Sequence, residues 1–163
     1  LKIWTMETWQ RLTELLIEAG AQMLHDADCV VPVPFIHGDG TEGFNQAEEL
    51  ARHLDIPMRR ALWRVRATAP QTLLDAKARR RNIRDAFRLS PFFTARRRRR
   101  WLEGRNVVLI DDVRTTGATL EACAALLRTV GVHEVRALTV AEPTSDRPDV
   151  NVLELNSRVT FTT

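Results

Sequence analysis

Apolar residues recur three and four positions apart in several segments of the chain, and this spacing predicts amphipathic helices. The first runs over residues 6–19, and Gly20 is expected to end it. Asn45 is expected to cap a second helix, with Glu48 completing a variant capping box, and Pro57 to close it. The remaining predicted helices cover residues 75–84 and 119–130.

Short apolar runs separate these helices and predict buried strands. The four runs cover residues 29–34, 62–65, 107–110 and 135–140. Strands that alternate with helices and are apolar on both faces indicate a parallel sheet with helices on both sides. We therefore predict an α/β fold in a single domain, residues 1–163, with its core over about 28–142 and a polar tail over 143–163.

Two adjacent acids and a threonine-rich turn follow the third strand, in the stretch VVLIDDVRTTGAT at 107–119. Asp111 and Asp112 stand at the carboxyl end of a strand, where open parallel sheets bind their ligands. Ribose hydroxyls and Mg²⁺ would compensate the repulsion between these carboxylates. The turn offers backbone N–H groups and threonine hydroxyls to a phosphate. Together they predict a ribose 5-phosphate site, whose phosphate nest consists of Thr115, Thr116, Gly117, Ala118 and Thr119.

Basic residues are concentrated in the middle of the chain. Residues 59–105 hold 16 of the 24 Lys and Arg and only three acids, whereas the flanking segments are net acidic. This asymmetry predicts an anionic partner, either a phosphorylated ligand or nucleic acid. One candidate contact for single-stranded DNA has arginines on phosphates and a tryptophan stacked on a base. It consists of Arg96, Arg97, Arg98, Arg99, Arg100 and Trp101. The structural alternative is a solvated loop with Trp101 folded onto the core.

Composition narrows the class of protein. The chain has 163 residues, of which 44% are hydrophobic, and no apolar run is long enough for a membrane helix. With no secretory signal pattern at the start, we expect a cytoplasmic location. Leu1 is not a methionine, which leaves a preceding segment open. Cys29 and Cys123 lie in apolar stretches without a Cys-x-x-Cys pair, so buried thiols are expected.

The acid pair and its loop resemble the signature of the type I phosphoribosyltransferases: an apolar strand, two acids and a T-T-G-x-T loop. Four other segments resemble the competence protein F (ComF) branch and occur in the same order. They are VPVP at 31–34, GFNQAE at 43–48, TAPQ at 68–71 and RRNIRDAF at 80–87. On these motifs the chain is identified as a ComF-like member of that superfamily over residues 28 to about 142.

This resemblance implies a Rossmann-like parallel core with a small hood, and binding of 5-phosphoribosyl-1-pyrophosphate (PRPP) with Mg²⁺. Asp111 and Asp112 would bind the ribose hydroxyls and, directly or through water, the metal. Residues 115–119 would hold the 5′-phosphate. A nitrogen nucleophile would then displace pyrophosphate at the anomeric carbon, with no general base assigned. The implied pyrophosphate contacts are the backbone at Val33 and Pro34 and a mobile basic loop with Arg79, Arg80 and Arg81.

The sequence departs from the ComF pattern in two places. Residues 35–42 contain two acids and no Arg or Lys, whereas ComF relatives usually carry arginines there. The cysteine-rich zinc ribbon of the family is also missing. We therefore favour a phosphoribosyltransferase but keep two alternatives: a PRPP-binding regulator without transfer, and a competence or DNA-uptake accessory that contacts single-stranded DNA through its basic face.

Several points stay open at this stage. The acid pair and loop could serve only as a strand end and a helix cap. The acceptor nucleophile is not readable from the sequence, because the hood that selects it is its least interpretable part. Relatives of this fold often form dimers, so a homodimer is one arrangement to test.

Overall fold

The computed structural model describes residues 6–35, 45–66, 76–111, 117–141 and 149–153. In chain order the helices are α1 (Met6–His25), α2 (Gln46–Arg52), α3 (Ala76–Arg84), α4 (Ala95–Trp101) and α5 (Gly117–Arg128). The strands are β1 (Cys29–Pro32), β2 (Leu62–Arg64), β3 (Phe87–Leu89), β4 (Asn106–Asp111), β5 (Glu134–Ala141) and β6 (Asp149–Leu153). Every helix and strand predicted from the apolar pattern is present, with shifted boundaries.

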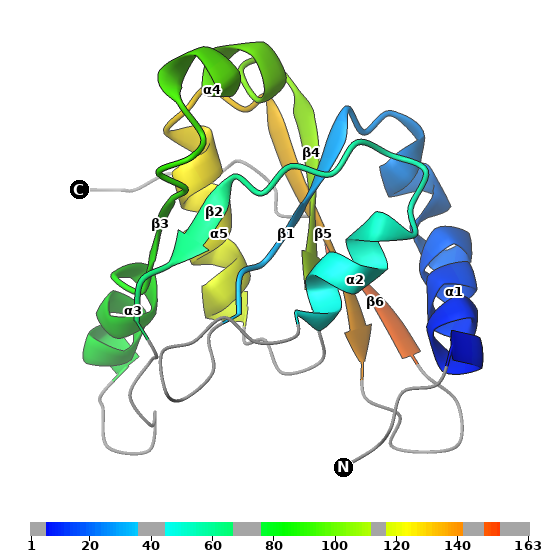
Figure 1. The fold of residues 1–163 in the computed structure, drawn as a ribbon. Coiled ribbons are helices and arrows are strands. Elements are labelled where there is room, and N and C mark those ends of the chain that lie inside the picture. The colour runs from blue at the N-terminus through cyan, green and yellow to red at the C-terminus, as the bar shows by residue number, and fades with distance from the viewer. Residues whose placement is uncertain (1–5, 36–44, 67–75, 112–116, 142–148, 154–163) are drawn as a thin grey trace.

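The main sheet has the strand order β1-β4-β5-β6. β1, β4 and β5 are parallel, and β6 adds antiparallel to β5 from the segment that the sequence left as a polar tail. The carboxyl ends of the three parallel strands therefore share one edge, the lower edge in Figure 1. β2 and β3 form a separate antiparallel pair beside α3.

Successive residues of β4 bury opposite faces of the sheet. Val108 and Ile110 pack in a cluster with apolar residues of α1 and α2, whereas Val107 and Leu109 pack with those of α5, β2 and β3. Figure 1 shows α1 and α2 on one side of the sheet and α5 on the other. The prediction of an α/β fold with a parallel sheet and helices on both faces is thus confirmed. None of the helices in the described part of the chain combines the length and apolar character that crossing a membrane requires.

Gly20 does not end the first helix, as the sequence predicted, because α1 continues to His25. A Cβ atom built at Gly20 would lie 2.6 Å from Cδ1 of Leu138, a fully buried residue of β5. The glycine therefore lets the helix approach the sheet closely and does not act as a stop. Gly131, by contrast, has a positive φ of 79° just after α5, as expected of a glycine that ends a helix.

The arginine run is a helix, which corrects the expected solvated loop. Thr94 caps α4, because its side-chain oxygen accepts a hydrogen bond from the backbone N–H of Arg97 at 3.4 Å. Trp101 ends the helix and packs against Phe93, with the ring centroids 5.7 Å apart. The prediction that Trp101 folds onto the core is confirmed.

Candidate functional site

The carboxyl edge of the sheet brings together the ends of several elements. β1 ends there at Pro32 and β4 at Asp111, and α5 begins there at Gly117 (Figure 1). β1 and β4 are in register, with Pro32 opposite Ile110, and the backbone N–H of Val33 donates to the carbonyl of Ile110 at 2.9 Å. The residues after β1 therefore lie beside the acid that ends β4.

Asp111 is the last residue of β4 and is buried at this edge. It pairs with Thr139 of β5, and only 5% of the residue is exposed. A carboxylate is rarely so deeply buried unless hydrogen bonds or positive charge compensate it. Its neighbour Asp112 lies outside the described residues, as do Thr115 and Thr116 of the predicted phosphate nest.

The first turn of α5 carries the rest of that nest. Gly117 is exposed and Ala118 and Thr119 are half-buried. A Cβ atom at Gly117 would meet nothing within 4 Å, so packing within the described residues does not demand a glycine there. The first N–H groups of a helix have no partner inside it and attract anions. Phosphate binding by Gly117, Ala118 and Thr119 stays a prediction.

Asn45 fixes the segment that the resemblance placed against pyrophosphate. Its Oδ1 accepts from the backbone N–H of Glu48 at 3.3 Å, which confirms the predicted N-cap of α2. Its Nδ2 donates to the carbonyl of Val33 at 3.1 Å, a bond that sequence reasoning missed. The backbone at Val33 and Pro34 is therefore tied both to β4 and to α2.

Glu48 does not complete the predicted capping box with its side chain. Its carboxylate accepts from Arg52 at 2.6 Å and from Arg60, so it is held between two guanidinium groups. The hydrogen bond from Arg60 is the main reason that the pKa of Glu48 lies below its ordinary value, with Arg52 acting in the same direction against burial.

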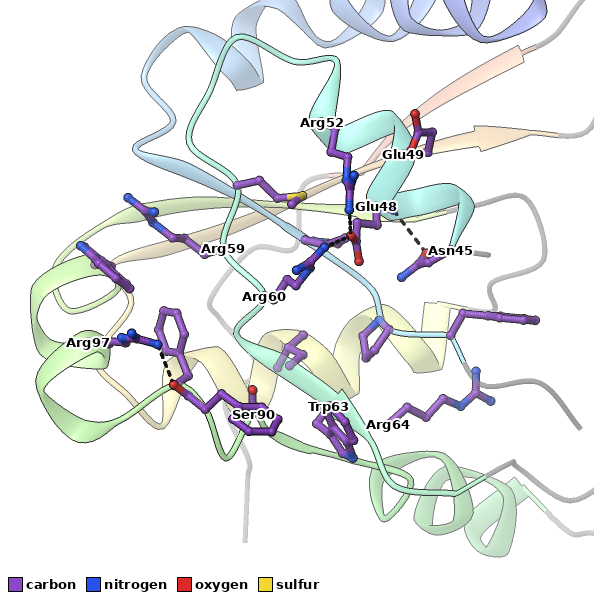
Figure 2. Close-up of a pocket in the computed structure, with 18 of the residues that line it drawn as sticks. Asn45, Glu48, Glu49, Arg52, Arg59, Arg60, Trp63, Arg64, Ser90 and Arg97 are labelled. Carbon is purple, nitrogen blue, oxygen red and sulfur yellow. Dashed lines mark hydrogen bonds and ion pairs between the residues drawn. The ribbon is translucent and has the colours of Figure 1, made fainter. Parts of the chain in front are cut away.

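Arg64 of β2 is a cation near the acid that sequence reasoning did not single out. Burial is the main cause that lowers the pKa of Arg64, and the negative charge of Asp111 opposes this shift. Its guanidinium carbon lies 5.3 Å from the centre of the Phe87 ring. In Figure 2 its side chain is directed toward the chain that follows β1. The sequence could have indicated this residue, because residues two apart in a strand face the same side. Arg64 therefore shares the inward face of Leu62 in the predicted strand, where a charged residue is unusual.

A groove of about 1030 Å³ starts at this edge and extends across β2 toward α4 (Figure 2). Asn45, Pro34 and Arg64 line the end near Asp111, and Arg97 and Trp101 line the other end. The wall is rich in arginine and aromatic side chains. Three of the four large hydrophobic residues that are exposed in the described structure line it, namely Phe35, Val65 and Phe92.

The arginines predicted to cover the site belong to α3. Arg81 is exposed in that helix, and Arg79 and Arg80 are part of its backbone. These residues are thus presented by a helix and not by a loop, in agreement with the helical pattern over 75–84. Their contact with a ligand stays a prediction.

The run from Arg96 to Trp101 lies at the opposite edge of the sheet, at the top of Figure 1. The Cys29 thiol, at the start of β1, lies 3.9 Å from the carbonyl oxygen of Trp101. Arg59 and Arg97 are within 4.4 and 5.7 Å of the centre of the Trp101 indole. Stacking of a base on Trp101 stays a prediction, and the base would share the ring with these two guanidinium groups.

The donor chemistry at the carboxyl edge suits Mg²⁺, although no group of three His, Cys, Asp or Glu side chains that could hold a metal occurs among the described residues. Mg²⁺ keeps several waters and is commonly bound through one or two carboxylates together with substrate phosphates. Asp111 supplies one such carboxylate. A metal here would therefore depend on the substrate as well as on the protein.

Comparison with known proteins gives the same superfamily as the motifs. The family model described as "Phosphoribosyl transferase domain" matches residues 10–160. The chain belongs to the phosphoribosyltransferase domain family. It is 35% identical to competence protein F of Haemophilus influenzae over 149 residues, which are 86% of this chain and 62% of that protein. It is also 35% identical to the DNA utilization protein YhgH of Escherichia coli (strain K12) over 132 residues, 77% of this chain and 54% of that protein.

The chain thus spans 54–62% of the length of these two relatives. A solved structure, glutamine phosphoribosylpyrophosphate amidotransferase from B. subtilis with ADP and GMP, has a TM-score of 0.48 and 24% identity. That likeness covers 79% of this chain and 25% of the other. The family match and the identity to competence protein F confirm the phosphoribosyltransferase-type fold and the ComF resemblance predicted from the motifs.

Proposed function

We propose that this phosphoribosyltransferase domain binds PRPP with Mg²⁺ at the carboxyl edge of its sheet and transfers the phosphoribosyl group to a nitrogen nucleophile. The observation that carries the proposal is the buried carboxylate of Asp111 just before the N-terminal turn of α5. The carboxylate would accept hydrogen bonds from ribose hydroxyls, and the helix N-terminus would bind the 5′-phosphate.

The reaction replaces one bond at the anomeric carbon. The nitrogen lone pair forms the new bond to that carbon while the bond to the pyrophosphate oxygen breaks and its electrons leave with pyrophosphate. The nitrogen then loses a proton to solvent. The negative charge of Asp111 stabilises the positive charge that develops on the ribose ring.

Two groups would stabilise the leaving group. Bound Mg²⁺ would neutralise part of the pyrophosphate charge, with Asp111 and Asp112 as its protein contacts. Arg64 would supply a cation at the same edge, in place of the arginines that residues 35–42 lack. Asn45 would keep the backbone at Val33 and Pro34 in position for this contact.

A test is to incubate the protein with PRPP, Mg²⁺ and a panel of nucleobases and amines, and to measure pyrophosphate release. The proposal expects release with at least one acceptor and its loss in Asp111→Asn, a nearly isosteric change. Binding of PRPP without release above the Asp111→Asn level for any acceptor would contradict transfer and favour a PRPP-binding regulator.

A second candidate is an accessory role in competence or DNA uptake through contact with single-stranded DNA. α4 presents exposed arginines at the edge opposite Asp111, and two relatives are named competence protein F and DNA utilization protein.

The test is to measure the fluorescence anisotropy of a labelled oligo-dT with a variant in which Arg96, Arg99 and Arg100 are changed to alanine. The matched control changes Arg66, Arg84 and Arg88, which are exposed outside α4. Equal losses in both triple variants would indicate general charge attraction only.

A further inference from the structure

A second cavity, of about 200 Å³, lies at the amino edge of the sheet. Its walls come from the turn before β1, the chain that follows α2, the end of α4 and the turn before β4. It is smaller than the pockets that hold drug-sized ligands, so it fits one small group. The lining residues are Asp28, Cys29, Arg59, Arg100, Trp101 and Arg105.

The cavity has an excess of positive charge. Its one acid, Asp28, accepts from Nη1 of Arg105 at 3.2 Å and from the backbone N–H of Asn106 at 2.8 Å. Within the described part of the chain, Arg59 and Arg100 make no ion pair. Two guanidinium groups therefore adjoin a small cavity without a protein carboxylate of their own.

Arg59 is held in place without using its full hydrogen-bonding capacity. Its backbone N–H donates to the carbonyl of Val30 at 2.8 Å, which anchors it beside β1. Its guanidinium carbon lies 4.4 Å from the centre of the Trp101 ring, and its buried Nε has no hydrogen-bond partner among the described residues. A guanidinium that is positioned by an aromatic ring is preorganised for the oxygens of a phosphate.

The remaining wall does not oppose an anion. Burial raises the pKa of the Cys29 thiol to about 11, so this side chain is neutral at pH 7. The charges of Arg59 and Arg105 act on the same pKa in the opposite direction, and the charge of Asp28 acts with burial.

We infer that this cavity binds a phosphate group, held by Arg59 and Arg100 beside the ion-paired Arg105 and separate from the ribose 5-phosphate site proposed at Asp111. The phosphate could belong to a free nucleotide or to the backbone of a nucleic acid strand, because both present the same oxygens. Arg59 and Trp101 also line the groove, so a ligand that is longer than its phosphate would continue along that surface. The inference does not depend on transferase activity.

The experiment measures binding of pyrophosphate, AMP and a labelled oligo-dT to the full chain in EDTA. EDTA removes Mg²⁺, so a magnesium-dependent site does not bind these probes. All measurements use the Asp111→Asn background, which removes the other candidate site. Arg100→Ala is compared with Arg96→Ala, because both remove one exposed arginine from α4 and only Arg100 lines the cavity. Arg59→Lys keeps the charge but loses the planar contact with Trp101, and thermal melts check that every variant is folded.

We expect Arg100→Ala and Arg59→Lys to weaken binding of at least one small phosphate about tenfold, and Arg96→Ala to change it less than twofold. Preference for AMP would assign a free nucleotide and preference for pyrophosphate a small free phosphate, whereas preference for oligo-dT with the same variant pattern would assign a strand. Equal weakening by Arg96→Ala and Arg100→Ala, or no binding of any probe, would overturn the inference.

Discussion

At the carboxyl edge of the sheet a buried carboxylate stands before the N-terminus of a twelve-residue helix, whereas at the amino edge arginines surround a small cavity beside a tryptophan. Both arrangements are suited to phosphate, but by different physics. Asp111 would repel a phosphate unless a cation lies between them, while Arg59 and Arg100 would attract one directly. Mg²⁺ should therefore be needed at the first edge and not at the second.

Different contacts hold the two edges in place. The carboxyl edge is fixed by strand register and by the bonds that Asn45 donates to Val33 and accepts from Glu48, so its geometry follows from the sheet and the α2 cap. The amino edge depends on packing of one tryptophan at the end of a seven-residue helix. Changes at the two edges should therefore separate into effects on magnesium-dependent and magnesium-independent binding.

The largest expected effect distinguishes two arginines of the same segment. Arg64→Ala should weaken magnesium-dependent binding of PRPP roughly tenfold to a hundredfold, because a charge-assisted contact contributes about 1.5–3 kcal/mol. Arg66→Ala removes the same charge from an exposed position two residues on and should change the affinity less than twofold. Calorimetric titration of both variants measures the difference. Similar affinities in the two variants would remove Arg64 from the site.

Two substitutions of Asn45 distinguish its role as the N-cap of α2 from its hydrogen bond to the carbonyl of Val33. Asn45→Ala loses both bonds and should destabilise the fold by about 1 kcal/mol, as expected for loss of an N-cap. Asn45→Asp keeps an oxygen for the cap but loses the Nδ2 donor to the carbonyl of Val33. Urea unfolding should therefore show near wild-type stability for Asn45→Asp, and PRPP titration a weaker affinity. An Asn45→Asp variant with unchanged affinity would show that this anchor does not serve the site.

How much of the carboxyl edge follows from the sequence depends on whether a contact is local. The strand, the acid at its end and the helix after it are encoded in one stretch, and the cap of α2 is encoded by Asn45 and its neighbours. Arg64 could not be found in this way, because β2 lies more than forty residues before Asp111 and packs in one core cluster with residues of β4 only in the folded structure. The same holds for Gly20, whose close contact is with Leu138.

The amino edge was the harder one to predict. Five consecutive arginines have no apolar periodicity, so the pattern indicated a loop, although arginine favours helices and the Thr94 cap and the packing of Trp101 support one here. The cavity joins residues 28–29, 59, 100–101 and 105, which are distant in sequence, and none of these segments has a phosphate-binding signature. β3 was also missed, since a three-residue strand forms only through its pairing with β2.

The smallest expected effect concerns the ion pairs that Glu48 makes at the groove. Because its pKa is lower in the folded protein, Glu48 adds stability above the ordinary pKa of a glutamate, and this stability is lost as the pH falls through the folded value. Glu48→Gln should therefore be slightly less stable than wild type at pH 7, by under about 1 kcal/mol. The difference should fade below pH 4, as measured by urea unfolding across pH. A constant difference over that range would mean that the charge of Glu48 does not contribute.

The most direct test of the account is calorimetric titration of PRPP into the wild-type chain and Asp111→Asn, each with Mg²⁺ and with EDTA. We expect a site in the wild-type protein that requires Mg²⁺ and that Asp111→Asn removes, with the variant still folded. Binding that is equally strong in EDTA, or that survives Asp111→Asn, would contradict a magnesium-dependent site at the end of β4.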